Sequence, residues 1–143
     1  MIDTFVFDLE GTLSNDSHRQ NLKKDLDKWH RAFSQDHPNY MICNLYRNLC
    51  FQSSVSVVIA TAKPECYRQM VLDWLSTRLL PLPDLLLMRR GDDLDTSPVV
   101  KWNMICELRM NGLNPIGLFD DRKDVCAKIS EECGIPTYLV RTE

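Results

Sequence analysis

The sequence predicts an α/β protein whose core is a single parallel β-sheet. Short apolar runs rich in β-branched and aromatic residues alternate with longer amphipathic stretches, as in strands joined by crossover helices. Several runs end directly in acidic, basic or hydroxyl residues. Parallel strands carry such residues to one edge of the sheet, where open α/β sheets bind ligands. The expected strands are residues 4–7, 55–60, 84–88, 116–119 and 136–140.

The first run, residues 4–7, is short and rich in Phe and Val, which is typical of a strand buried on both faces. An acid-x-acid-Gly-Thr sequence follows it, with Asp8 and Glu10 as the two acids. Gly11 permits a sharp exit from the sheet. Two carboxylates are therefore expected at the carboxyl end of a buried strand, although a strand that simply ends in solvent could also carry an acid.

Residues 14–50 are expected to form a loop and helices that together make a small insert. Residues 14–20 are polar and favour a loop over the active edge, in which His18 and Arg19 either touch substrate or are solvated. Residues 38–49 begin with a proline and carry an apolar stripe at helical spacing. The expected stripe contains Met41, Ile42, Leu45, Tyr46 and Leu49.

A short helix is expected over residues 25–33, because its apolar residues recur at helical spacing. Trp29 and Phe33 are interpreted as its core face rather than as a platform for a nucleobase. His30 and His37 have no partner at useful spacing and are interpreted as structural or exposed. A longer helix is expected over residues 65–79, with Cys66, Met70, Val71, Trp74 and Leu75 directed inward.

Polar residues also follow the second and third expected strands. Thr61 comes directly after residues 55–60, where a hydroxyl can cap the next helix. Lys63 lies close behind it, and Arg89 follows residues 84–88. These two basic residues either bind an anion at the active edge or belong to solvated loops balanced by nearby acids.

Lys101 lies near the start of an amphipathic helix expected over residues 99–108. A lysine in the first turn opposes the helix dipole, so a counter-charge is expected beside it; an ordinary surface lysine is the alternative. The fourth strand, residues 116–119, is followed by the acidic pair Asp120 and Asp121.

Composition describes an ordinary globular chain of 143 residues and 16.6 kDa, with 44% hydrophobic and 26% charged residues. We expect one domain, residues 1–143. The net charge of −3 gives no basic field for coating a nucleic-acid duplex. The 6 cysteines lack metal-binding spacing and are expected to be free thiols. Without a signal peptide or a membrane-length apolar run, a cytoplasmic protein with no membrane partner is expected.

The residues that end these strands, together with the lysine, resemble the motifs of the haloacid dehalogenase-like (HAD) phosphatase superfamily. Its first motif is normally Asp-x-Asp-Gly-Thr, which Asp8 and Glu10 match as the two acids. The positions that match its other motifs are Thr61, Lys101, Asp120 and Asp121. The resemblance implies a three-layer fold with a five-stranded parallel sheet in the order 3-2-1-4-5 and a minimal cap. That order makes the first and fourth strands neighbours.

The same resemblance implies a phosphomonoesterase that works through an aspartyl-phosphate. Asp8 is the implied nucleophile and Glu10 the implied general acid and base. Thr61 and Lys101 are implied to hold the phosphoryl oxygens. The implied cofactor is Mg²⁺, which prefers hard oxygen ligands. The candidate metal ligands are Asp8, Glu10, Asp120 and Asp121.

Glu10 departs from the family pattern, in which the second acid is usually Asp. Glutamate has the same chemistry but is longer by one methylene, and a misplacement of about 1 Å can cost on the order of a hundredfold in rate. On this reasoning alone, Glu10→Asp is expected to speed turnover. A weak or inactive phosphate-binding module is the alternative to an enzyme.

A wider set of segments resembles the phosphatase domain of phage polynucleotide kinase and its small stand-alone relatives. These segments are residues 8–12, 17–19, 87–89, 91–92, 100–101 and 119–122. The narrower resemblance implies a nucleic-acid 3′-phosphate end or a nucleotide as substrate, and a phosphorylated metabolite stays open. The candidate substrate-binding residues are Arg19, Thr61, Lys63, Arg89 and Lys101.

Overall fold

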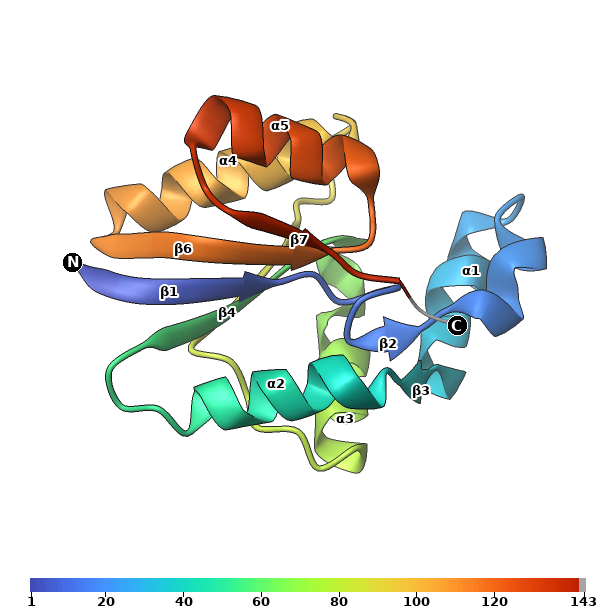
Figure 1. Ribbon diagram of the computed structural model, residues 1–143. Helices are drawn as coiled ribbons and strands as arrows, with labels where there is room; N and C mark the ends of the chain where they lie inside the picture. The colour runs from blue at the N-terminus through green and yellow to red at the C-terminus, as the bar shows by residue number, and fades with distance from the viewer. Residues whose placement is uncertain (142–143) are drawn as a thin grey trace.

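The computed structural model describes residues 1–141 and contains one five-stranded parallel sheet (Figure 1). The strand order is β5-β4-β1-β6-β7, which in the numbering of the expected strands is 3-2-1-4-5 and confirms that expectation. The strands are β1 (Ile2–Phe7), β4 (Ser56–Pro64), β5 (Leu85–Arg89), β6 (Leu113–Asp120) and β7 (Thr137–Leu139).

Helices cover both faces of the sheet and make three layers (Figure 1). Side chains alternate along each strand. In β1, Phe7 therefore packs with α2 and α3, whereas Val6 packs with α4 and α5 on the other face. The covering helices are α2 (Tyr40–Cys50), α3 (Arg68–Thr77), α4 (Ser97–Met110) and α5 (Lys123–Cys133), and the short 3₁₀ turn η3 (Glu65–Tyr67) precedes α3.

An insert between β1 and α2 lies beyond the carboxyl edge of the sheet (Figure 1). It leaves and rejoins the body through a two-stranded antiparallel pair, in which Ser14 faces Pro38 and Asn15 faces His37. We call the insert the cap. Its elements are β2 (Ser14–Asn15), η1 (Ser17–Leu22), α1 (Leu26–Arg31), η2 (Ala32–Gln35) and β3 (His37–Pro38).

The cap is smaller than the expected insert of residues 14–50, because α2 belongs to the body. Cys43 and Tyr46 of α2 are buried in the core beneath the sheet, and Tyr46 donates a hydrogen bond to the Pro81 carbonyl over 2.7 Å. The buried face of α2 therefore differs from the expected apolar stripe, in which Met41 and Leu45 were included. Met41 is 83% exposed and Leu45 is 36% exposed. The helix is rotated so that the small Cys43 faces the sheet.

Two further details differ from expectation. Cys66 is exposed rather than inward, because η3 precedes α3 and turns residue 66 outward. The described cysteines are free, as expected. No helix in residues 1–141 is both long enough and apolar enough to cross a membrane.

Candidate active site

Three carboxylates from two neighbouring strands meet at the carboxyl edge of the sheet. The β1–β6 register pairs Phe7 with Phe119, so that Asp8 and Asp120 come next in each strand. The Asp8 amide extends the ladder by donating to the Phe119 carbonyl over 2.8 Å. One carboxylate oxygen from each of Asp8, Asp120 and Asp121 lies within 4.8 Å of the others. We call these three residues the acid cluster.

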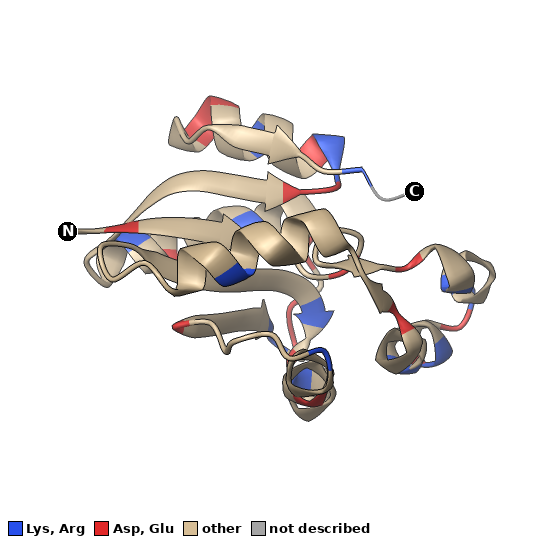
Figure 2. Cartoon of the chain, turned by 60° about the horizontal axis from the view of Figure 1, so that its bottom comes forward, with Lys and Arg blue, Asp and Glu red and all other residues tan. Residues whose placement is uncertain are grey.

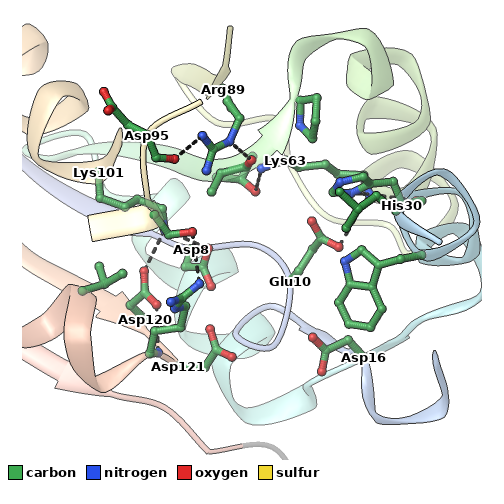
Figure 3. Close-up of a pocket in the computed structure, with 18 of the residues that line it drawn as sticks. Asp8, Glu10, Asp16, His30, Lys63, Arg89, Asp95, Lys101, Asp120 and Asp121 are labelled. Atoms are coloured by element: carbon green, nitrogen blue, oxygen red, sulfur yellow. Dashed lines mark hydrogen bonds and ion pairs between the residues drawn. The ribbon is translucent and has the colours of Figure 1, made fainter. Parts of the chain in front are cut away.

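Lys101 lies between two members of the acid cluster (Figure 3). Its Nζ donates to Asp8 Oδ1 over 2.9 Å and to Asp120 Oδ2 over 2.7 Å. Burial alone would lower the pKa of Lys101, but Asp120 and Asp8 outweigh it and raise that pKa, so the ammonium stays charged. The counter-charge expected beside Lys101 is therefore a pair of carboxylates. Lys101 lies in the second turn of α4, which begins at Ser97, and not in the first turn.

Gly11 makes room for the third carboxylate. Its φ is +81°, and a Cβ at this position would lie 2.3 Å from Asp121 Oδ2. Burial, followed by the charges of Asp8 and Asp120, raises the pKa of Asp121 well above its ordinary value. Burial and Asp8 also raise the pKa of Asp120. The crowded acids therefore carry more negative charge than the Lys101 ammonium offsets.

The acid cluster fits a hard divalent cation. Its donors are all carboxylate oxygens, the ligand type that Mg²⁺ takes, and the raised pKa of Asp121 marks a site that a cation would relieve. Glu10 is not part of this cluster among residues 1–141. Its carboxylate instead contacts two cations on the opposite side of the site, and the expectation that Glu10 binds metal stays a prediction.

Those two cations are Arg19 and Lys63. Glu10 Oε2 lies 2.7 Å from Arg19 Nη2 and 3.5 Å from Lys63 Nζ. The angles of these two contacts do not satisfy hydrogen-bond geometry. Within residues 1–141, Glu10 Oε2 is the only buried side-chain oxygen or nitrogen without a hydrogen bond. The extra methylene of glutamate thus carries the carboxylate toward the cap.

Arg19 has a different place from the one expected for a substrate contact. Its side chain is 0% exposed and donates to Asp36 through Nε over 2.8 Å and through Nη2 over 2.7 Å. Its Nη1 donates to the Trp29 carbonyl, and its guanidinium covers the Trp29 ring at 4.1 Å. Arg19 therefore positions Glu10 and the cap instead of facing the open cleft. A bidentate pair of this kind fixes geometry.

Asp36 was not found by sequence reasoning, yet it organises the cap. It is 0% exposed and also accepts hydrogen bonds from Ser14 Oγ over 2.8 Å and His18 Nε2 over 2.7 Å. Its carbonyl accepts from Trp74 Nε1 over 2.9 Å, which ties the cap to α3. His18 is thus a cap residue that binds Asp36.

Thr61 lies in the carboxyl-terminal half of β4 and lines the cleft together with Asp8. Its side chain is buried and its Oγ1 accepts from the Lys63 amide over 3.1 Å, which leaves the hydroxyl proton free to donate. Thr12 holds the other oxygen of the nucleophile candidate, because its Oγ1 donates to Asp8 Oδ2 over 3.0 Å. Sequence reasoning gave Thr12 only a place in the motif.

Lys63 connects the body to the cap. Its Nζ donates to the His30 carbonyl over 2.8 Å and lies 3.2 Å from His30 Nδ1. Burial lowers the pKa of Lys63 to about 8, although Glu10 opposes the change. His30, interpreted from the sequence as structural or exposed, is half-buried and lines the cleft.

Arg89 is bound mainly to backbone. It donates through Nε to the Ala62 carbonyl over 2.9 Å, and through Nη1 to the Asp93 and Asp95 carbonyls over 3.1 Å and 2.6 Å. It therefore fastens the loop after β5 to the end of β4 (Figure 3). Arg89 also lines the cleft, and its expected role in substrate binding stays a prediction.

The cleft above these residues has a volume of about 860 Å³ (Figure 3). The acid cluster forms its floor, the cap forms one wall, and the loop after β5 with Arg122 forms the other. Asp16 lines the cap side, and burial, with Asp36 and Glu10 nearby, raises its pKa. In the described part of the chain, basic residues are spread over several elements and interleaved with acids (Figure 2).

The fold and the motif arrangement are those of the HAD superfamily. The parallel sheet, the acids at the ends of β1 and β6, and the lysine from α4 match what its motifs imply. A family model described as "Polynucleotide kinase PNKP phosphatase domain" matches residues 2–142. The chain belongs to this family.

Solved structures support the same fold. A chain in "Structure of the Pnkp1/Rnl/Hen1 RNA repair complex" has a TM-score of 0.84 and 23% identity, covering 97% of this chain and 42% of that chain. This protein thus spans less than half the length of that relative. A HAD family enzyme from Bacteroides thetaiotaomicron, in complex with magnesium and inorganic phosphate, has a TM-score of 0.61 and 15% identity, covering 99% and 95%. Comparison with curated proteins finds no match.

Proposed function

We propose that this protein is a Mg²⁺-dependent phosphomonoesterase that acts through an aspartyl-phosphate on Asp8. The observation that carries the proposal is the acid cluster with Lys101 across it, at the floor of a cleft of about 860 Å³. A phosphate monoester is a dianion, so a carboxylate can attack it only where positive charge is concentrated. Lys101 provides part of that charge.

In the proposed reaction, Asp8 attacks phosphorus and the bond to the leaving alcohol breaks. Glu10 gives its proton to the leaving oxygen, and later takes a proton from the water that attacks the aspartyl-phosphate. Thr61 and Lys101 donate to the phosphoryl oxygens. Mg²⁺ held by the acid cluster would neutralise charge and orient the phosphoryl group. Release of inorganic phosphate restores the Asp8 carboxylate.

The proposed substrate is a nucleic-acid 3′-phosphate end or a nucleotide. Support comes from the family and from the relative in an RNA repair complex. The cleft is much larger than a phosphate group, which leaves room for a nucleoside. The dispersed basic residues favour an enzyme that binds one chain end over a protein that coats a duplex.

Release of inorganic phosphate from an aryl phosphate, measured with Mg²⁺ and with a chelator, tests the proposal. Asp8→Asn should abolish release, because an amide cannot accept the phosphoryl group. Asp73→Asn changes an exposed acid of α3 that accepts a hydrogen bond from Gln69 and is not among the residues that line the cleft, and it should leave the rate unchanged. Phosphate binding without release by the unaltered protein would instead indicate a binding module. Oligonucleotides with 3′- or 5′-phosphate, beside mononucleotides, then test the substrate class.

A further inference from the structure

His30 presents one nitrogen to a fixed partner and the other to solvent. Nδ1 lies 3.2 Å from Lys63 Nζ. An ammonium group can only donate, so Nδ1 is the acceptor and the ring proton is on Nε2. Lys63 is held in this position by its second hydrogen bond, to the His30 carbonyl over 2.8 Å. The tautomer of His30 is thus set by the body of the protein.

The Nε2–H group has no hydrogen-bond partner among residues 1–141. Within this range, Glu10 Oε2 is the only buried side-chain oxygen or nitrogen without a hydrogen bond. Because His30 Nε2 also lacks a hydrogen bond but is not in that class, it is not buried and reaches solvent. The residue lines the cleft on the cap side, next to Lys63 (Figure 3). Burial, together with Lys63 and Arg19, lowers the pKa of His30 to about 4, so the imidazole is neutral near pH 7. The neutral N–H group can donate to an uncharged acceptor without bringing a second positive charge beside Lys63.

Part of the cleft lining is apolar. Leu26, Trp29, Pro64 and Leu94 line the same cleft as His30, and Leu26 and Leu94 are 66% and 94% exposed. The charged side chains that line the cleft are mixed in sign, with Asp16, Asp93 and Asp95 beside Lys23, Lys63 and Arg89, so the apolar side chains are the feature that suits an uncharged ring. One face of Trp29 is already covered by Arg19, so Trp29 acts as a wall.

We propose that His30 donates its Nε2–H to an uncharged acceptor on the alcohol that carries the phosphate, and so selects the leaving group. The inference rests on the proposed phosphatase function and deepens it. The N–H donor and the apolar lining suit an alcohol with a ring and a carbonyl or ether acceptor, as in one nucleoside.

Two isosteres of His30 separate this role from support of Lys63. His30→Asn keeps an acceptor near the Nδ1 position and removes the donor, whereas His30→Gln keeps a donor near the Nε2 position. The probes are thymidine 3′-monophosphate, whose base has neutral carbonyl acceptors, and phenyl phosphate, which has a ring without one. The measured quantity is the ratio of kcat/KM for the first probe to that for the second.

His30→Asn should lower this ratio threefold to tenfold, or about 0.7–1.4 kcal/mol, which lies within the range for one lost hydrogen bond. His30→Gln should keep the ratio within about twofold, a range too small to represent a lost hydrogen bond. Lys28→Ala, at an exposed position of the same helix, should match the unaltered protein. A normal ratio in His30→Asn, or an equal loss on both probes, overturns the inference.

A binding measurement on a variant that cannot react separates the role of His30 from catalysis. Calorimetry of thymidine 3′-monophosphate with Mg²⁺ on Asp8→Asn should give a threefold to tenfold weaker Kd when His30→Asn is added, and no such change with His30→Gln. If the unaltered protein hydrolyses neither probe, the proposed function fails while this binding difference still decides the role of His30. Equal affinity in both double variants, or no binding at all, refutes that role.

Discussion

Gly11→Ala tests whether the close approach of Asp121 to the backbone builds the acid cluster. The new Cβ would lie 2.3 Å from Asp121 Oδ2 and 2.7 Å from its Cγ. Contact between non-bonded atoms is favourable near about 3.5 Å, so the carboxylate must retreat by about 1 Å. A displacement of about 1 Å costs on the order of a hundredfold in rate. We expect kcat/KM to fall about that much, and the Mg²⁺ concentration for half-maximal activity to rise.

The same substitution also strains the backbone, and Gly112 provides the matched control. The φ angles are +81° at Gly11 and +78° at Gly112, but a Cβ at Gly112 meets nothing within 4 Å. A left-handed backbone costs a non-glycine residue about 1–2 kcal/mol. That corresponds to a fall in Tm of roughly 3–8 °C in a chain of this size. We expect this fall in both variants, but loss of activity only in Gly11→Ala.

Phosphate release across a Mg²⁺ titration, with thermal unfolding of both variants, is the assay. If Gly11→Ala keeps the activity and Mg²⁺ dependence of Gly112→Ala, then Asp121 does not hold the cation, and the reasoning from this contact is refuted.

Three more predictions follow from the site. Lys101→Met should lower kcat about 100-fold to 1000-fold and also lower Tm, because Asp8 and Asp120 lose their shared counter-charge. In scanning fluorimetry, Mg²⁺ should restore part of the lost Tm, and no restoration would contradict a cation site. Glu10→Asp withdraws the carboxylate by about 1.5 Å from Arg19 and Lys63, so kcat should fall about tenfold to 100-fold. This is the opposite of the expectation from the motif alone, and faster turnover would restore that expectation. The pKa of His30 is lowered from 6.5 to about 4, so the unfolded state binds more protons than the folded state between these pH values. The stability of the folded state therefore falls as the pH drops from 6.5 to 4. His30→Asn should flatten this fall of Tm, and an unchanged slope would refute the role of His30 in it.

The sheet and the acid motif were predictable because their signals are local. Residues 4–7 read as a buried strand, and Asp8 follows within one residue of its end. Strand order came from the family resemblance, and it brings Asp120 beside Asp8 across more than a hundred residues. Lys101 was found for the same reason, although its depth of burial was not visible in the helical pattern.

The cap network was not predictable, because it depends on contacts between distant residues. Asp36 binds Arg19 across 17 positions, and Lys63 binds His30 across 33, with no repeating spacing in either pair. Arg89 looked free because its acceptors are backbone carbonyls, which leave no mark in the sequence. Basic residues near an active edge were therefore found, but their partners were not.

The short neck of the cap has a consequence for how such a protein can change. Ser14 pairs with Pro38, and the Asn39 amide donates to the Leu13 carbonyl over 2.8 Å, so the two ends of the cap meet at one point of the body. Segments between such ends can lengthen at small entropic cost without moving the sheet. New substrate preferences could thus arise by exchange of this appendage alone, provided that the Arg19–Asp36 pair is inherited with it.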